Sequence, residues 1–131
     1  MSENTGREKY LLLIVEDPAV FTTWSPERFE QHAADHREFA AAIEAAGATQ
    51  LASEPLDAEA VRFRPDAGGG PSLVTDGPFP EAKEIVLGFY LLEVPDAEVA
   101  RDLASRCPTM GYVELRRTWT DDAKVSGIPD A

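Results

Sequence analysis

The chain has 131 residues, of which 44% are hydrophobic and 27% charged, the composition of a single globular domain. Its formal net charge of −12 argues against nucleic acid or an anionic membrane as a partner. A single cysteine excludes an intrachain disulfide, and the first ten residues lack the apolar core of a signal peptide, so we expect a cytoplasmic protein.

The first predicted element is a strand at residues 10–15, where apolar residues follow one another without a break. Such a run is typical of a strand covered on both faces, and it is far too short to span a bilayer. A helix is predicted next, because Ser25 is a suitable N-cap and Pro26 suits the first helical position. Trp24 and Phe29 occupy the two positions of a hydrophobic staple around this cap.

This helix is predicted to reach about Ala46 and to stop at Gly47, which suits a left-handed cap. Short strand-like segments follow at residues 48–56, 60–64 and 72–75, with a Gly- and Pro-rich loop at 66–71. Residues 84–94 form a second long apolar stretch, which Gly88 interrupts.

Asp96 is expected to cap a second helix that runs to about Arg106. Its inner face would carry Val99, Ala100, Leu103 and Ala104. Cys107 follows this helix, and we interpret it as a small apolar plug or a partly exposed thiol rather than a nucleophile. Residues 112–117 alternate as a strand does, with Val113 and Leu115 on one side.

The order strand, helix, several strands, helix, strand predicts an α+β domain with two helices on one face of an antiparallel sheet. We expect one domain over residues 1–131, with loose termini at 1–8 and 118–131. Because the runs at 10–15 and 85–92 are apolar at successive positions, the second face of the sheet also needs cover. We therefore predict a homodimer in which two sheets pack face to face.

The two histidines, His32 and His36, both lie on the first predicted helix. Helical spacing places His36 on a stripe with Phe29 and Ile43, which also includes Ala33 and Ala40, and His32 at the edge of this stripe near Phe39. Three interpretations remain open: a structural core histidine, a general acid/base at the floor of a pocket, and a pair of metal ligands at i, i+4. The spacing lacks the glutamate of H-E-x-x-H and an obvious third ligand, so we predict no metal site.

Residues 75–84 read TDGPFPEAKE, and the stretch from Asp76 to Glu84 resembles the DGPF motif, which family members commonly write as DGPFAETKE. The resemblance is to the DGPF-domain branch of the YCII-related family, and it reaches to about Arg117. Other matching positions are Lys9–Val15, Gly88, Tyr90, Arg106-Cys107-Pro108 and Val113-Glu114-Leu115-Arg116. It implies a ferredoxin-like fold that dimerises into an α+β barrel.

The resemblance also implies a paired histidine and aspartate as a site. His36 precedes Gly47 by eleven residues, which is the family spacing of that histidine. Asp76 and Asp57 are rivals for the aspartate, and we favour Asp76 because it stands at a strand end beside Gly77. DGPF proteins are often encoded beside sigma factors of the extracytoplasmic-function type, so the resemblance also implies a regulatory protein partner.

Two functions are therefore expected. The first is a small-molecule-binding protein that acts as a cofactor-independent enzyme of the lyase or isomerase type, in which His36 is the acid/base and Asp76 orients it or acts as a second carboxylate. Phe79, Lys83, Glu84 and Arg116 would contact the ligand, whereas Glu81 is expected at the surface. The second is a non-catalytic sensor or a regulatory module that binds a protein partner. No nucleotide-binding motif is present, so no cofactor is predicted.

Overall fold

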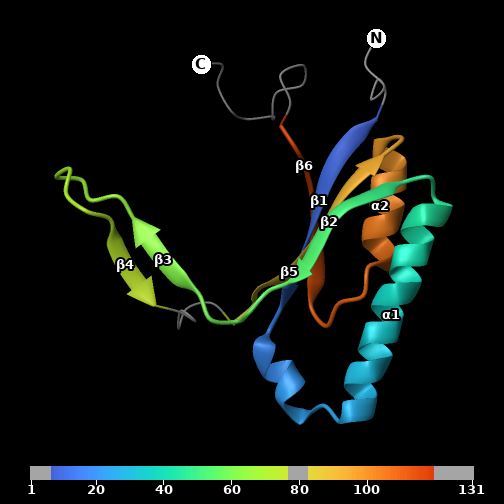
Figure 1. Ribbon diagram of the computed structural model, residues 1–131, viewed down its shortest axis with the longest axis horizontal. Helices are drawn as coiled ribbons and strands as arrows, with labels where there is room; N and C mark the ends of the chain where they lie inside the picture. The colour runs from blue at the N-terminus through green and yellow to red at the C-terminus, as the bar shows by residue number, and fades with distance from the viewer. Residues whose placement is uncertain (1–6, 77–82, 120–131) are drawn as a thin grey trace.

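The computed structural model describes residues 7–76 and 83–119, except for the side chains of residues 73, 75 and 76. In chain order the elements are β1 (Glu8–Glu16), the 3-10 helix η1 (Pro18–Thr23), α1 (Pro26–Ala45), β2 (Thr49–Pro55), β3 (Val61–Arg64), β4 (Leu73–Asp76), β5 (Ile85–Val94), α2 (Ala97–Arg106) and β6 (Tyr112–Arg117). The fold is α+β and ferredoxin-like, as predicted (Figure 1).

A four-stranded antiparallel sheet with the order β2-β5-β1-β6 forms the centre of the molecule, and α1 and α2 cover one of its faces (Figure 1). β1 is a central strand that pairs with β5 on one side and with β6 on the other. We call this unit, with its two helices, the body. None of the helices in the described ranges is long and apolar enough to cross a membrane.

Local sequence features start and stop both helices as predicted. The Ser25 side chain accepts a hydrogen bond from the Arg28 amide at 3.1 Å, and the Trp24 and Phe29 rings meet edge to face at 5.1 Å. Gly47 has a φ of 76°, the left-handed conformation expected after a helix end. The Asp96 side chain accepts from the Val99 amide at 2.9 Å and caps α2.

The core lies between the helices and the covered face of the sheet. Alternate residues of β1 and β5 point into it, together with Phe39 and Ile43 of α1 and Ala100 and Leu103 of α2. Leu12, Leu92 and Val94 are completely buried. Burial of this apolar surface is the main favourable contribution to folding. Val99 and Ala104 pack against the same cluster, as predicted.

The predicted stripe of α1 is correct only in part. Ile43 is buried and His36 faces the sheet, as predicted, but Ala33 and Ala40 are exposed and Phe29 is 47% exposed, and Phe39, predicted beside the edge of the stripe, is buried. Alanines occur on several sides of α1, so they do not mark its inner face, and the two bulky residues near its end determine which side packs on the sheet.

The face of the sheet away from the helices is apolar at its centre, and no described helix covers it (Figure 1). Cross-strand pairing places Leu11 opposite Leu91 and Leu13 opposite Phe89 on this face. Glu114 and Arg116 of β6 stand next to Leu13 and Leu11. We call this surface the open face; its apolar members are Leu11, Leu13, Phe89, Leu91 and Tyr112.

β3 and β4 pair only with each other and form a hairpin that projects away from the body (Figure 1). This hairpin, residues 61–76, is called the arm. Val61 and Phe63 share one side of it with Val74, which pairs with Phe63, and these three side chains are 53%, 64% and 57% exposed. The two predicted strands therefore exist, but they do not join the main sheet.

Candidate functional site

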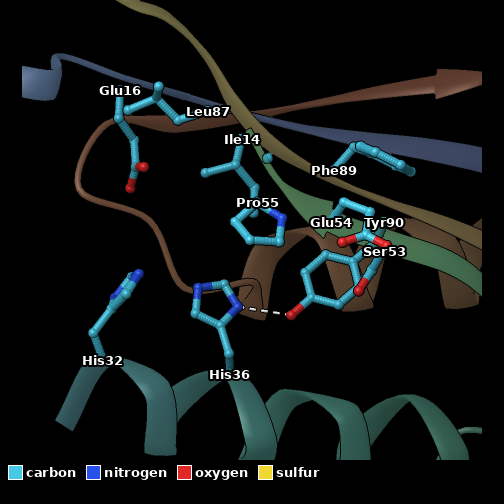
Figure 2. A pocket seen from close by; sticks show the side chains of 11 residues that line it. Ile14, Glu16, His32, His36, Ser53, Glu54, Pro55, Leu87, Phe89 and Tyr90 are labelled. Carbon is cyan, nitrogen blue, oxygen red and sulfur yellow. Dashed lines mark hydrogen bonds between the residues drawn. The ribbon is translucent and has the colours of Figure 1, made fainter. Parts of the chain in front are cut away.

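A cavity of about 310 Å³ lies between α1 and the facing parts of β1, β2 and β5 (Figure 2). α1 contributes both histidines, and the strands form the opposite wall. The lining residues are Ile14, Glu16, His32, His36, Ser53, Glu54, Pro55, Leu87, Gly88, Phe89 and Tyr90. A cavity of this size, mostly apolar with a few polar groups, suits a small organic ligand.

His36 and Tyr90 make the central polar contact of this cavity. The Nδ1 atom of His36 lies 2.7 Å from the phenolic oxygen of Tyr90, and the two rings stack with centroids 5.9 Å apart (Figure 2). Tyr90 belongs to the helix-facing side of β5, where the ring of Phe39 packs against it at 5.0 Å. Burial, reinforced by the nearby Cys107, raises the pKa of Tyr90 to about 12. The phenol is therefore neutral at physiological pH.

Burial lowers the pKa of His36 below its ordinary value of 6.5, and the neighbouring His32 lowers it further. The carboxylates of Glu16 and Asp35 act in the opposite direction and favour the imidazolium. Desolvation is the larger effect, so the imidazole is neutral at pH 7. A neutral imidazole with one nitrogen bonded to Tyr90 leaves its other nitrogen, Nε2, for the cavity.

His32 stands one helical turn before His36, and the two rings meet edge to face with centroids 4.6 Å apart. The rings of Trp24 and Phe21 lie 5.2 Å and 6.0 Å from His32. η1 and the helix cap thus supply an aromatic wall that fixes His32 at the mouth of the cavity. The sequence prediction had placed His32 near Phe39 instead.

Glu16 is an acid at the end of β1 and is only 3% exposed. Its Oε2 atom accepts hydrogen bonds from the Met110 amide at 2.7 Å and from the Thr109 hydroxyl at 3.4 Å. These bonds tie the end of β1 to the loop between α2 and β6. Figure 2 shows the carboxylate on the same side of the cavity as His32. Glu16 therefore contributes a buried carboxylate to the strand wall of the cavity that His32 and His36 line from α1.

The structure does not test the predicted pair of His36 and Asp76. The backbone of Asp76 pairs with Val61 in the arm, but the described part of the chain does not include its side chain. Phe79 and Glu81 lie outside the described residues. Lys83 and Glu84 are exposed just before β5 and are not among the lining residues of the cavity.

Asp57 and Arg116, two further candidates, do not line this cavity. The carboxylate of Asp57 accepts a hydrogen bond from the Glu59 amide at 2.9 Å, which is a local turn contact. Arg116 stands on the open face and pairs with Glu114 at 3.4 Å. No lysine or arginine is present among the described residues that line the cavity.

Cys107 is buried, and this burial, reinforced by Glu16, raises the pKa of its thiol to about 12. The thiolate needed for nucleophilic attack is therefore scarce at neutral pH, which agrees with the predicted apolar plug. Within residues 7–76 and 83–119, no group of three or more His, Cys, Asp or Glu side chains is arranged to hold a metal ion.

Sequence reasoning did not identify Glu16 and Tyr90 as site residues. Tyr90 interrupts an aliphatic strand with a group that needs a hydrogen-bond partner when buried, and Glu16 ends the longest apolar run with an acid. Both features were visible in the sequence. Their proximity to His36 was not, because it depends on the pairing of β1 with β5, which are distant in sequence.

Comparison with known proteins finds a family model and a relative to which this chain is similar. Residues 9–118 match the model of the YCII-related domain. The chain is also 34% identical, over 115 residues, to an uncharacterized protein of Rhizobium meliloti, and the alignment covers 82% of this chain and 89% of that protein.

Proposed function

The chain belongs to the YCII-related family, and we propose that it binds a small organic molecule in the cavity beside His36 and transfers a proton to or from it. The reaction would be of the lyase or isomerase type and would need no cofactor, because removal of a proton starts it and the electrons of the broken C–H bond stay in the organic molecule or leave with its own leaving group. The observation that carries this proposal is the 2.7 Å contact between His36 and Tyr90 inside a ligand-sized cavity.

In the proposed mechanism His36 is the general base. When Nδ1 carries the ring proton and donates it to the phenolic oxygen of Tyr90, the Nε2 lone pair is available to the ligand. After Nε2 takes a proton, the imidazolium still donates from Nδ1 to Tyr90. Because the pKa of Tyr90 is about 12, the phenol stays neutral and holds the ring in one orientation throughout.

Glu16 would stabilise the protonated form of His36. Its charge raises the pKa of His36 against the effect of burial, so it favours the imidazolium that forms during the reaction. The lowered pKa keeps His36 in its basic form at neutral pH, which is the state that the first step requires.

The remaining features of the proposal come from the sequence. Asp76 is the proposed partner carboxylate, and Phe79, Lys83 and Glu84 are proposed ligand contacts near the start of β5. Arg116, on the open face, would reach a ligand only on that side of the sheet. The motif at residues 76–84 supports membership of the DGPF branch, and we place the protein in the cytoplasm as a homodimer that joins two open faces into an α+β barrel.

The proposal is tested by proton exchange at carbon. Small lactones and 1,3-dicarbonyl compounds are incubated with the protein in D₂O, and the loss of their exchangeable C–H signals is followed by NMR. We expect His36→Ala to slow the exchange by a factor of about 10²–10⁴, and Tyr90→Phe to slow it less, because the base then loses only its orienting partner.

His32→Ala is the matched control, since it removes a histidine of the same helix face and leaves the contact of His36 with Tyr90 intact. Equal rates for the wild-type protein and His36→Ala would contradict the catalytic role. Unchanged binding of the same compounds by His36→Ala would show that this histidine is not part of the ligand site either.

A second candidate is a non-catalytic sensor or a module that binds a regulatory protein, such as a sigma factor. The exposed apolar side chains of the arm favour it, because such side chains are typical of protein contacts. Compounds that bind in the cavity without exchange, together with capture of a purified sigma factor by the purified protein, would support this candidate over the enzyme.

A further inference from the structure

The charged side chains that line the cavity are acids. Glu16 and Glu54 contribute two carboxylates, and the lining residues of the described chain include neither lysine nor arginine. Residues 77–82, which lie outside the described ranges, read GPFPEA and add no basic residue to the sequence at this point. Carboxylates repel an anion at short range, and the repulsion is stronger in a partly desolvated cavity than in water. A ligand without negative charge avoids this repulsion.

Glu16 has one carboxylate oxygen that is not used by the fold. Its Oε2 atom accepts the hydrogen bonds from the Met110 amide and the Thr109 hydroxyl, whereas Oε1 has no hydrogen bond to the described residues. The residue is 3% exposed, and its side chain extends from the strand wall toward α1 (Figure 2). Burial of a carboxylate oxygen without a donor is costly. A ligand that presents an N–H or O–H group to Oε1 would remove this cost.

The other side of the cavity offers a donor instead of an acceptor. Figure 2 shows His36 between Glu16 on one side and Tyr90 on the other. When the phenolic oxygen of Tyr90 accepts the bond from Nδ1 of His36, its own O–H group remains to donate to a ligand. A carbonyl oxygen that accepts this bond is polarised, and the C–H groups next to the carbonyl become more acidic. Such a C–H group is what a base such as His36 would attack.

We propose that the cavity takes an uncharged or cationic carbonyl compound, whose carbonyl oxygen accepts a hydrogen bond from Tyr90 and whose N–H or O–H group donates to Glu16. Carboxylates and phosphates are rejected. This inference rests on the ligand site proposed above and adds the charge class of the ligand.

The state of His36 agrees with this charge class. Burial lowers the pKa of His36, so the imidazole is neutral and can accept a proton. An anion bound beside this ring would raise the pKa of His36 and favour the imidazolium before the reaction begins. An uncharged or cationic ligand leaves the base in the form that the first step requires.

The first test compares three compounds that share one exchangeable methylene group: acetoacetamide, which is uncharged, its N-aminoethyl derivative, which is cationic, and acetoacetate. Each is titrated into ¹⁵N-labelled protein, and the amide signals of Gly88 and Tyr90 report occupancy of the cavity. We expect the dissociation constant of acetoacetate to be about tenfold or more above that of acetoacetamide, and the cationic compound to bind at least as tightly as acetoacetamide. Equal or tighter binding of acetoacetate, or no binding of any of the three at millimolar concentration, overturns the proposal.

The second test assigns the selection to Glu16. Glu16→Gln keeps an oxygen that can accept from the Met110 amide and removes the negative charge. We expect it to lower the ratio of the dissociation constants of acetoacetate and the cationic compound about tenfold. Glu98→Gln, which removes an equal charge from an exposed position on α2, leaves the ratio unchanged. Equal effects of both variants overturn the role of Glu16. The first test uses the wild-type protein, so it decides the charge class even where Glu16→Gln fails to fold.

Proton exchange separates this inference from the proposed catalysis. The exchange rate of each methylene group in D₂O is divided by the rate that free imidazole gives with the same compound, which corrects for differences in acidity. Binding with the expected preference but without faster exchange supports the charge class and contradicts proton transfer. Faster corrected exchange of acetoacetate than of the other two compounds supports proton transfer and overturns the charge class.

Discussion

The body and the arm are built from the same antiparallel pairing, yet they bury their apolar residues to opposite extents. In the body, Leu12, Leu92 and Val94 are completely buried beneath α1 and α2. In the arm, Phe63 and Val74 face each other across the hairpin and are 64% and 57% exposed. Hydrogen bonding between strands does not by itself bury a side chain. Burial requires a second layer of helices or strands packed on the sheet.

The two regions therefore depend on different partners. The body finds its second layer within the chain, because the helices lie next to the strands that they cover. The arm has no such layer among the described residues, and its apolar side is available to another molecule. The same type of substitution, made once in the body and once in the arm, measures how much each region contributes to the stability of the folded chain.

The largest expected effect is a contrast between two glycines. A Cβ at Gly111 would overlap the carbonyl oxygen of Val15, and backbone atoms cannot move away cheaply. Gly111→Ala should lower the free energy of unfolding by more than about 3 kcal/mol. Gly68→Ala, in the loop of the arm with only the Asp66 side chain near, should change it by less than about 0.5 kcal/mol. Urea denaturation followed by circular dichroism measures both, and similar losses would contradict the contrast.

Two valines provide the next contrast. Val94 is completely buried, so Val94→Ala should cost about 2–3 kcal/mol in the free energy of unfolding at every protein concentration. Val74→Ala should leave the unfolding of the dilute protein within about 0.5 kcal/mol of wild type, since this side chain is exposed. Thermal unfolding over a concentration series checks this. A large effect of Val74→Ala in dilute solution would mean that the arm belongs to the body.

Two aspartates extend the contrast to hydrogen bonds at the backbone. Asp96 caps α2, so Asp96→Ala should cost about 1 kcal/mol. Asp66 bonds the Gly68 amide at 3.2 Å within the arm, and Asp66→Ala should cost less than half of that, because this turn supports no helix. Chemical denaturation of both variants is the measurement, and the reverse order of the two losses would count against this interpretation.

The smallest expected effect is a dependence of stability on pH. Burial lowers the pKa of His36 in the folded state below 6.5, so the unfolded chain binds a proton more readily. The contribution of His36 to stability is complete above about pH 6.5 and is lost as the pH falls toward its folded-state pKa. His36→Asn should remove this slope, as measured by urea midpoints between pH 5 and 7.5. A variant that keeps the wild-type slope would assign it to another group.

The elements that sequence predicted best are those with local causes. Ser25, Gly47 and Asp96 each satisfy backbone groups within a few residues, and each acts as predicted. The inner face of α1 was predicted only in part, because its alanines do not distinguish the two sides and only packing on the sheet does. The detachment of the arm was also not predictable, since β3 and β4 have the composition of ordinary strands.

The candidate site was also predicted only where its cause is local in the sequence. Sequence identified His36, which the cavity includes, but not its hydrogen bond to Tyr90 or the buried carboxylate of Glu16. These contacts join residues that are far apart in the chain, and only the strand order brings them together. Asp76, which the family resemblance favours, remains a prediction.

The central position of β1 also affects how the chain folds during synthesis. Its two neighbours, β5 and β6, begin at Ile85 and Tyr112, so β1 leaves the ribosome long before either partner exists. At about 5–20 residues per second, the wait for β5 lasts roughly 3–14 s, and the apolar side chains of β1 remain unpaired throughout. Contacts at such sequence separation also favour slow folding. The chain therefore passes through a period in which its central strand lacks both neighbours, and completion of β6 ends it.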